Sequence, residues 1–137
     1  MDKKTLIDHL NDDLAGELQA IVQYLQHSYL VKGLGRIPIH DLFEEISKDE
    51  MGHAESLAER IVAMGGVPTT KPKVINQTND TVEMIKFNLV REEEALAGYA
   101  KRIKEAEEAG EIGTALILEN ILVDEQGHWD NLSMLLR

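Results

Sequence analysis

The chain contains no cysteine, and aromatic residues make up only 4% of its 137 residues. Without cysteine it can form no disulfide, no iron–sulfur cluster and no zinc site built from thiolates. No apolar run approaches the roughly 18–20 residues that a membrane span needs, and the first residues do not resemble a signal peptide. We therefore expect a protein of the cytoplasm that has no membrane partner.

Basic residues are also scarce relative to acidic ones. The chain has 14 lysines and arginines against 25 aspartates and glutamates, which gives a net charge of −11. This charge argues against nucleic acid as a partner and suits a protein that handles cations, although surplus acid also keeps a surface soluble. A length of 137 residues with 43% hydrophobic residues predicts one globular domain over residues 1–137.

Apolar residues recur at alternating steps of three and four, the spacing of helices that bury one face. The first such segment starts near Thr5 and ends at Lys32–Arg36, where glycines can cap a helix. Pro38 suits the first turn of a second helix, and Gly65 stops it. Asn79 or Asp80 can cap a third helix, which closes near Gly110 before a fourth.

The lengths of the connections predict how these helices are arranged. The first and second helices are joined by a short turn, as are the third and fourth, so each pair must be antiparallel. About 14 extended residues around Pro68 and Pro72 can span roughly 45 Å, enough to traverse the whole bundle. We therefore predict an all-α four-helix bundle with one long crossover between helices 2 and 3.

One polar pattern occurs twice in the chain, 75 residues apart. Asp49–His53 reads Asp-Glu-Met-Gly-His, and Asp124–His128 reads Asp-Glu-Gln-Gly-His. A Glu and a His three positions apart on a helix point the same way, so each copy offers a carboxylate and an imidazole together. The same offset carries a Glu-x6-Tyr segment from one half of the chain to the other. The repeated polar residues are Glu17, Tyr24, Glu50, His53, Glu92, Tyr99, Glu125 and His128.

These eight residues occupy positions of the helical pattern that face the core. Four carboxylates in an apolar interior would each cost several kcal/mol, and the pattern shows no lysine or arginine facing the core with them. Two divalent ions would balance four glutamates and two neutral histidines. Oxygen-rich ligation with one imidazole per ion favours iron, with manganese as the alternative. We expect the metal ligands to be Glu17, Glu50, His53, Glu92, Glu125 and His128.

Other residues of the pattern have candidate supporting roles. Tyr24 and Tyr99 lie two turns after a ligand glutamate, where they can bind a carboxylate, donate an electron or simply pack. Asp49 and Asp124 either orient a histidine across the bundle or belong to a solvated helix face.

On these motifs, and over nearly its whole length, the chain resembles the ferritin-like superfamily and bacterioferritin most closely. The resemblance implies that Glu50 and Glu125 bridge two irons, and that Glu17 and Glu92 are terminal ligands. It implies a ferroxidase, in which Fe(II) is oxidised by O2 or H2O2 and the ferric product is stored inside a shell.

The resemblance also implies a haem at a twofold between subunits, because bacterioferritins ligate it through a methionine at the position of Met51. The chain stops without the fifth helix of 24-subunit ferritins, so we expect a homo-oligomer of 12 subunits built from dimers. Two other functions stay open. One is a rubrerythrin-like di-iron peroxidase or oxidase that stores nothing, and the other is a haem-bridged electron-transfer bundle.

Overall fold

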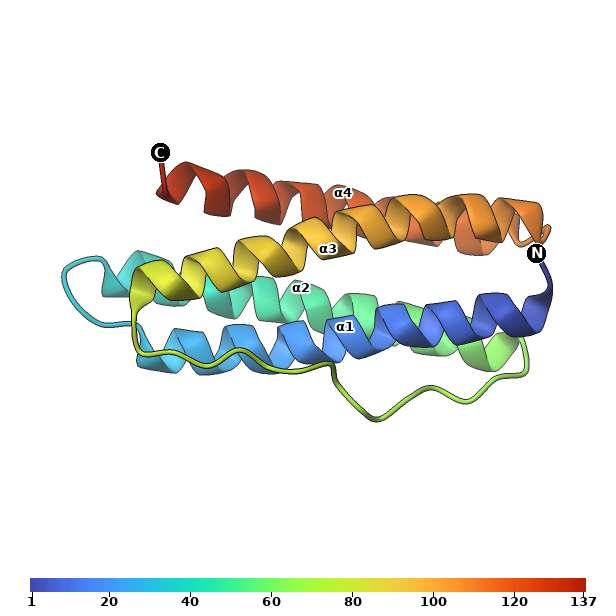
Figure 1. Cartoon of the computed structure of the whole chain (residues 1–137), viewed down its shortest axis with the longest axis horizontal. Helices are drawn as coiled ribbons and strands as arrows, with labels where there is room; N and C mark the ends of the chain where they lie inside the picture. Colours follow the sequence, from blue (N-terminus) through green and yellow to red (C-terminus); the bar gives the residue numbers. More distant parts are fainter.

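The computed structural model describes residues 1–137 and consists of four long α-helices without strands, as predicted (Figure 1). The elements are α1 (Lys3–Leu30), α2 (Arg36–Ala63), α3 (Thr81–Glu108) and α4 (Ile112–Leu135). The antiparallel partners α1 and α2 form one tight pair, and α3 and α4 form the other. The two pairs meet through α1 against α3 and α2 against α4. No helix is both long enough and apolar enough to cross a membrane.

The helix ends follow local sequence signals. Asp2 and Asp80 cap α1 and α3, since their carboxylates accept the backbone N–H of Thr5 and Glu83 at 2.7 and 2.9 Å. Beyond α1 and α2 the chain turns at Gly33 and Gly65, both with φ of +95°, a conformation that favours glycine. Gly33 lies in the short turn that joins α1 and α2, whereas Gly65 follows the end of α2, where the crossover begins.

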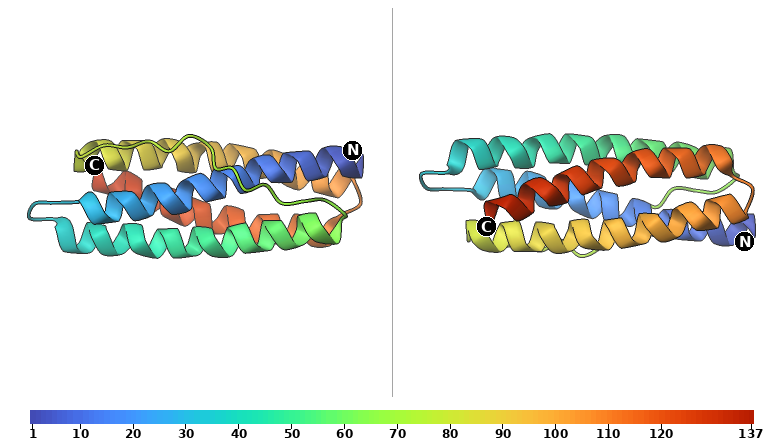
Figure 2. Two further views of the ribbon diagram at one scale, coloured as in Figure 1. Left: turned by 90° about the horizontal axis from the view of Figure 1, so that it is seen from below. Right: turned by 90° about the horizontal axis from the view of Figure 1, so that it is seen from above.

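The crossover between α2 and α3 follows α1 back to the end of the bundle where α3 begins (Figure 2). Side chains of α1 hold it in place: Gln19 donates to the carbonyl of Val74 at 2.7 Å, and His27 Nε2 lies 2.9 Å from the carbonyl of Asn76. Polar residues on the side of α1 that faces the crossover thus satisfy backbone groups of an extended segment that has no sheet partner.

The interior consists of two apolar clusters separated by a polar middle. Leu10, Leu57 and Leu118 belong to the larger cluster, whereas Phe43 and Leu132 belong to the smaller one. All of these side chains are at most 1% exposed. The apolar clusters provide the hydrophobic stabilisation, and they frame a buried polar layer that crosses all four helices.

Candidate metal centre

Each helix contributes one glutamate to the middle of the bundle. Glu17 from α1, Glu50 from α2, Glu92 from α3 and Glu125 from α4 are all 0% exposed. The helical spacing places them there because each lies on the same face as the apolar residues before and after it. The structure therefore brings the four predicted carboxylates into one dry site.

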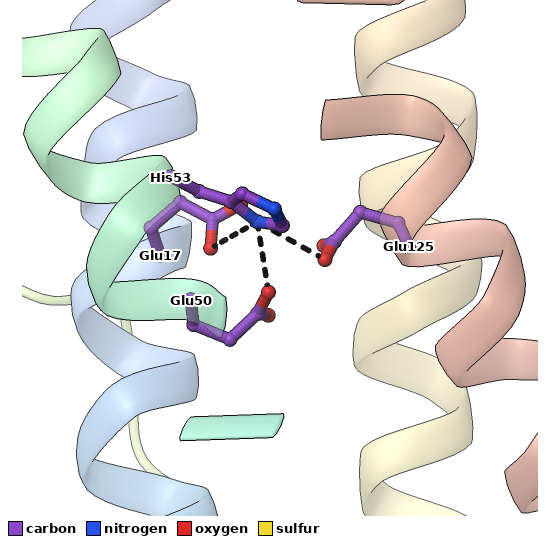
Figure 3. Close-up of side chains that lie close together, drawn as sticks. All are labelled: Glu17, Glu50, His53 and Glu125. Atoms are coloured by element: carbon purple, nitrogen blue, oxygen red, sulfur yellow. Dashed lines mark ion pairs between the residues drawn. The ribbon is translucent and has the colours of Figure 1, made fainter. Parts of the chain in front are cut away.

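His53 of α2 faces three of these carboxylates. Its Nδ1 lies 3.0 Å from Glu50 Oε1, 3.4 Å from Glu125 Oε1 and 3.6 Å from Glu17 Oε2 (Figure 3). One ligand atom from each of these residues falls within 4.8 Å of the others. We call this set of four residues the first group.

His128 of α4 has equivalent surroundings on the other side. Its Nδ1 lies 3.2 Å from Glu125 Oε1, 3.6 Å from Glu92 Oε1 and 3.7 Å from Glu50 Oε1. These four residues, which we call the second group, also place their ligand atoms within 4.8 Å of one another. Glu50 and Glu125 belong to both groups, so the centre consists of two adjacent sites with two shared carboxylates.

The two aspartates of the repeated motif hold the histidines from the opposite helix. His53 Nε2 lies 2.8 Å from Asp124, and His128 Nε2 lies 2.9 Å from Asp49. A histidine that donates from Nε2 in this way presents Nδ1 to the centre, as a metal-binding histidine requires. Of the two readings of these aspartates, the structure supports the orienting one.

Each tyrosine of the repeat likewise contacts a glutamate from the other half of the chain. Tyr24 donates to Glu92 Oε1 at 2.7 Å, and Tyr99 donates to Glu17 Oε1 at 2.5 Å. Both rings are almost fully buried, at 0% and 2% exposure. Each hydroxyl therefore holds one oxygen of a carboxylate, while the other oxygen, Glu92 Oε2 or Glu17 Oε2, has no hydrogen-bond partner.

Each of the six predicted ligands has one buried atom without a hydrogen-bond partner. These atoms are Glu17 Oε2, Glu50 Oε1, His53 Nδ1, Glu92 Oε2, Glu125 Oε1 and His128 Nδ1. Buried polar atoms are almost always paired, and unpaired carboxylate oxygens facing one another repel. Since all six atoms converge on the two groups, the residues fit a pair of metal ions well.

The pKa values of the ligand side chains also indicate that the centre favours positive charge. Burial alone would lower the pKa of His128, but the carboxylates of Glu125 and Glu92 outweigh burial and raise it to about 11. Burial also opposes protonation of His53, yet Glu125, Glu17 and Glu50 raise its pKa well above the ordinary value. The pKa of Glu50 is raised by burial and by its two neighbouring carboxylates. The centre attracts cations, whether protons or metal ions.

One expectation about the core is wrong, because a basic residue does face the centre. Arg91 of α3 is only 4% exposed, and its guanidinium lies 3.3–3.4 Å from Glu17, Glu50 and Glu125. Steps of three and four residues from Glu92 leave the preceding residue, Arg91, just outside the expected core face of α3. A helix packed on two partners buries a wider stripe, and the spacing of Asn88, Arg91 and Ala95 was the available signal.

A second polar cluster was also missed, in the smaller apolar half of the bundle. His27 is fully buried, and its Nδ1 lies 3.1 Å from the amide nitrogen of Asn88. Gln23 donates to Asn88 Oδ1 at 2.8 Å and accepts the backbone N–H of Asn76 at 2.9 Å. This network links α1, α3 and the crossover.

Met51, the predicted haem ligand, lies apart from the centre. Its side chain is 48% exposed on α2 and borders a surface hollow together with Ile21 and Leu25 of α1. It follows Glu50 directly, so it points away from the core while the carboxylate points in.

Comparison with known proteins was consistent with this geometry. A family model described as a ferritin-like domain matches residues 7–137. A bacterioferritin of Desulfovibrio desulfuricans is 35% identical over 92% of this chain and 71% of its own length.

Two solved structures are similar throughout. A ferritin-like, diiron-carboxylate protein of Bacillus anthracis is 38% identical with a TM-score of 0.97, covering 100% of this chain and 99% of that one. A dodecameric thioferritin, the bacterioferritin-related protein of Bacteroides fragilis, is 29% identical with a TM-score of 0.91. The match covers 99% of this chain and 86% of the thioferritin.

Proposed function

Because the chain belongs to the ferritin-like family, we propose that it is a ferroxidase that stores or detoxifies iron as one domain spanning residues 1–137. Two Fe(II) ions are the substrate, and each gives up one electron to become Fe(III). O2 takes up the two electrons with two protons to form H2O2, or H2O2 takes them up with two protons to form two waters. The observation that carries this proposal is the set of six unpaired ligand atoms in two adjacent groups.

Each residue has a role that follows from its contacts. Glu50 and Glu125 lie in both groups and would contact both ions, whereas Glu17 and Glu92 would each serve one. His53 and His128 would each bind one ion through Nδ1. The donors are four carboxylates and two imidazoles, which suit iron and also accommodate manganese. Tyr24 and Tyr99 would keep the outer carboxylates oriented during uptake and release of iron.

Storage additionally requires a closed shell, for which we propose 12 subunits assembled from dimers. The dodecameric relative supports this number. Exposed apolar side chains such as Val22, Tyr29, Val62 and Val90 offer surface for subunit contacts. We keep the cytoplasm as the predicted location.

An iron titration tests the oxidation, and native mass tests the storage. Anaerobic addition of Fe(II) followed by air should oxidise about two irons per subunit in a fast phase. A fast phase with no fixed stoichiometry would contradict the centre. A native mass of a dimer, before and after iron loading, would contradict storage and leave a di-iron oxidase. Elemental analysis of the purified protein distinguishes iron from manganese.

A haem bound through Met51 is the second cofactor that we propose. Support comes from a Rhodobacter capsulatus bacterioferritin whose structure contains haem iron, 32% identical over 96% of this chain, and from the exposed thioether beside the apolar surface of Ile21 and Leu25. The thioether of Met51 would bind the haem iron, and one methionine from each of two subunits would hold the haem between them. A Soret band in the haem-reconstituted protein that disappears in Met51→Leu would support this site. The same band in both proteins would contradict it.

A further inference from the structure

Arg91 is a charged residue inside the centre that the proposed chemistry does not use. Its Nε donates to the carbonyl oxygen of Gly16 at 3.0 Å, which anchors the side chain against α1. One terminal nitrogen lies 3.3 Å from Glu125 Oε2, and the other lies 3.4 Å from Glu50 Oε2 and 3.3 Å from Glu17 Oε1. The guanidinium therefore contacts three carboxylates from three different helices at once.

In each of these carboxylates, Arg91 contacts one oxygen, whereas the other oxygen has no hydrogen-bond partner. The oxygens that Arg91 contacts are Glu17 Oε1, Glu50 Oε2 and Glu125 Oε2. The opposite oxygens, Glu17 Oε2, Glu50 Oε1 and Glu125 Oε1, are the unpaired atoms that face the metal positions. A planar fork of fixed donors is well suited to hold several carboxylates in this orientation.

Arg91 does not treat the two groups alike. It contacts the two shared residues, Glu50 and Glu125, and also Glu17 of the first group, but it forms no ion pair with Glu92 of the second group. The repeat explains the difference. The residue that precedes Glu17, 75 positions before Arg91, is Gly16, which has no side chain to offer an equivalent contact on the other side.

Arg91 stays positively charged inside the centre. A guanidinium keeps its proton in proteins, so four carboxylates and Arg91 together carry a charge of −3. The first divalent ion is attracted strongly, but two ions would leave an excess of +1 beside the guanidinium. The guanidinium repels most strongly the ion that lies closest to Arg91.

On the basis of the proposed metal centre, we propose that Arg91 is a positioning residue that makes the two metal positions unequal. It holds one oxygen each of Glu17, Glu50 and Glu125 away from the metals, and its charge makes the first group, with His53, the weaker site for a divalent cation. The second group, with His128, fills first. Iron then enters the centre in two steps of different affinity, and the weaker position is the one that can release its ion.

Single-site variants test this inequality with Zn²⁺, which binds without being oxidised. His53→Ala leaves the second group intact, and His128→Ala leaves the first. By calorimetric titration, we expect His53→Ala to bind its Zn²⁺ about tenfold more tightly than His128→Ala, as one extra unit charge nearby would produce. In the Arg91→Gln background the difference should fall to about twofold or less.

Arg60→Gln is the matched control, because Arg60 contacts Thr114 and Glu111 and no ligand residue. It should leave the tenfold difference in place. Equal Zn²⁺ affinities in the two histidine variants would overturn the proposal, as would a difference that persists in Arg91→Gln. If Arg91→Gln does not fold, the comparison of the two histidine variants decides alone. A wild-type chain that binds no Zn²⁺ would instead contradict the metal centre itself.

Discussion

The two halves of the chain, α1–α2 and α3–α4, contribute the same ligands but differ in what surrounds them. Each half supplies a glutamate, a tyrosine and an Asp-Glu-x-Gly-His motif, and each holds the ligands of the other: Tyr24 binds Glu92, whereas Tyr99 binds Glu17. Neither half can form the centre alone, because every ligand depends on a partner across the bundle.

The supporting residues break this symmetry. Arg91 corresponds to Gly16 and Met51 to Gln126, so a buried charge occurs in one half and an exposed thioether in the other. Outside the centre, the ion pair of Asp13 with Arg102 corresponds to the neutral pair of Asn88 with His27. The ligand set is the same in the two halves, whereas the charge and the anchoring contacts around it differ.

Removing the two shared carboxylates would destroy the centre in both halves at once. In the double variant Glu50→Ala, Glu125→Ala we expect rapid Fe(II) oxidation to fall at least about 100-fold, because both metal positions lose two ligands. Stopped-flow absorbance after mixing with air-saturated buffer measures the rate. Replacement of the exposed Glu55 by Ala serves as the control, and a double variant as fast as this control would refute the ligand assignment.

The ion pair at one end of the bundle should matter more for stability than its neutral counterpart. Arg102 binds both oxygens of Asp13, at 2.8 and 3.2 Å, with both side chains 9% exposed. Arg102→Gln would leave Asp13 buried and unpaired, which should lower the free energy of unfolding by about 3 kcal/mol. Urea unfolding of the metal-free protein measures this loss.

The pH dependence of that variant gives a sharper test. Burial raises the pKa of Asp13 to about 6 even with Arg102 present. A carboxyl whose pKa is raised on folding stabilises the folded state below the unfolded pKa, and this stability is lost as pH rises through 6. Arg102 favours the charged form of Asp13. The stability lost in Arg102→Gln should therefore be larger at pH 7.5 than at pH 5. A loss that does not change with pH would show that Asp13 is not the group left unpaired.

The two tyrosines should be unequal although their contacts are related by the repeat. Glu92 Oε1 has Tyr24 as its hydrogen-bond donor, whereas Glu17 Oε1 has both Tyr99 and Arg91 within 3.3 Å. We therefore expect Tyr24→Phe to weaken Zn²⁺ binding about tenfold and Tyr99→Phe about threefold, as the loss of one hydrogen bond to a charged group allows. The reverse order in calorimetry would mean that Arg91 does not secure Glu17.

The neutral network of His27 should give the smallest effect, and only in acid. Burial lowers the pKa of His27, which accepts from Asn88 and lies against the carbonyl of Asn76. A depressed pKa contributes stability above the unfolded value of about 6.5 that is lost as pH falls. Between pH 7 and pH 5 the wild type should lose about 1 kcal/mol more than His27→Gln in urea unfolding. If the unfolding free energies of the wild type and of His27→Gln fall in parallel as pH is lowered, His27 is not held in its neutral form by this network.

Much of the fold could be read from local patterns. The steps of three and four, the glycines at Gly33 and Gly65 and the caps such as Asp80 act within a few residues, so they predict the helices and their ends. The 75-residue repeat likewise identified the six candidate ligands, because helical spacing alone decides that Glu50 and His53 share a face.

What only the tertiary structure decided is which residues meet across helices. Arg91, Asn88 and His27 look like ordinary polar positions in the sequence, and their burial depends on how far each helix is rotated against two neighbours. The same holds for the exchange of Tyr24 and Tyr99 between distant carboxylates. Periodicity describes one helix at a time, whereas contacts between helices depend on their relative rotation and register. Helical spacing and the repeat therefore indicated which side chains converge in the bundle, and packing determined that the charge of Arg91 joins them on one side.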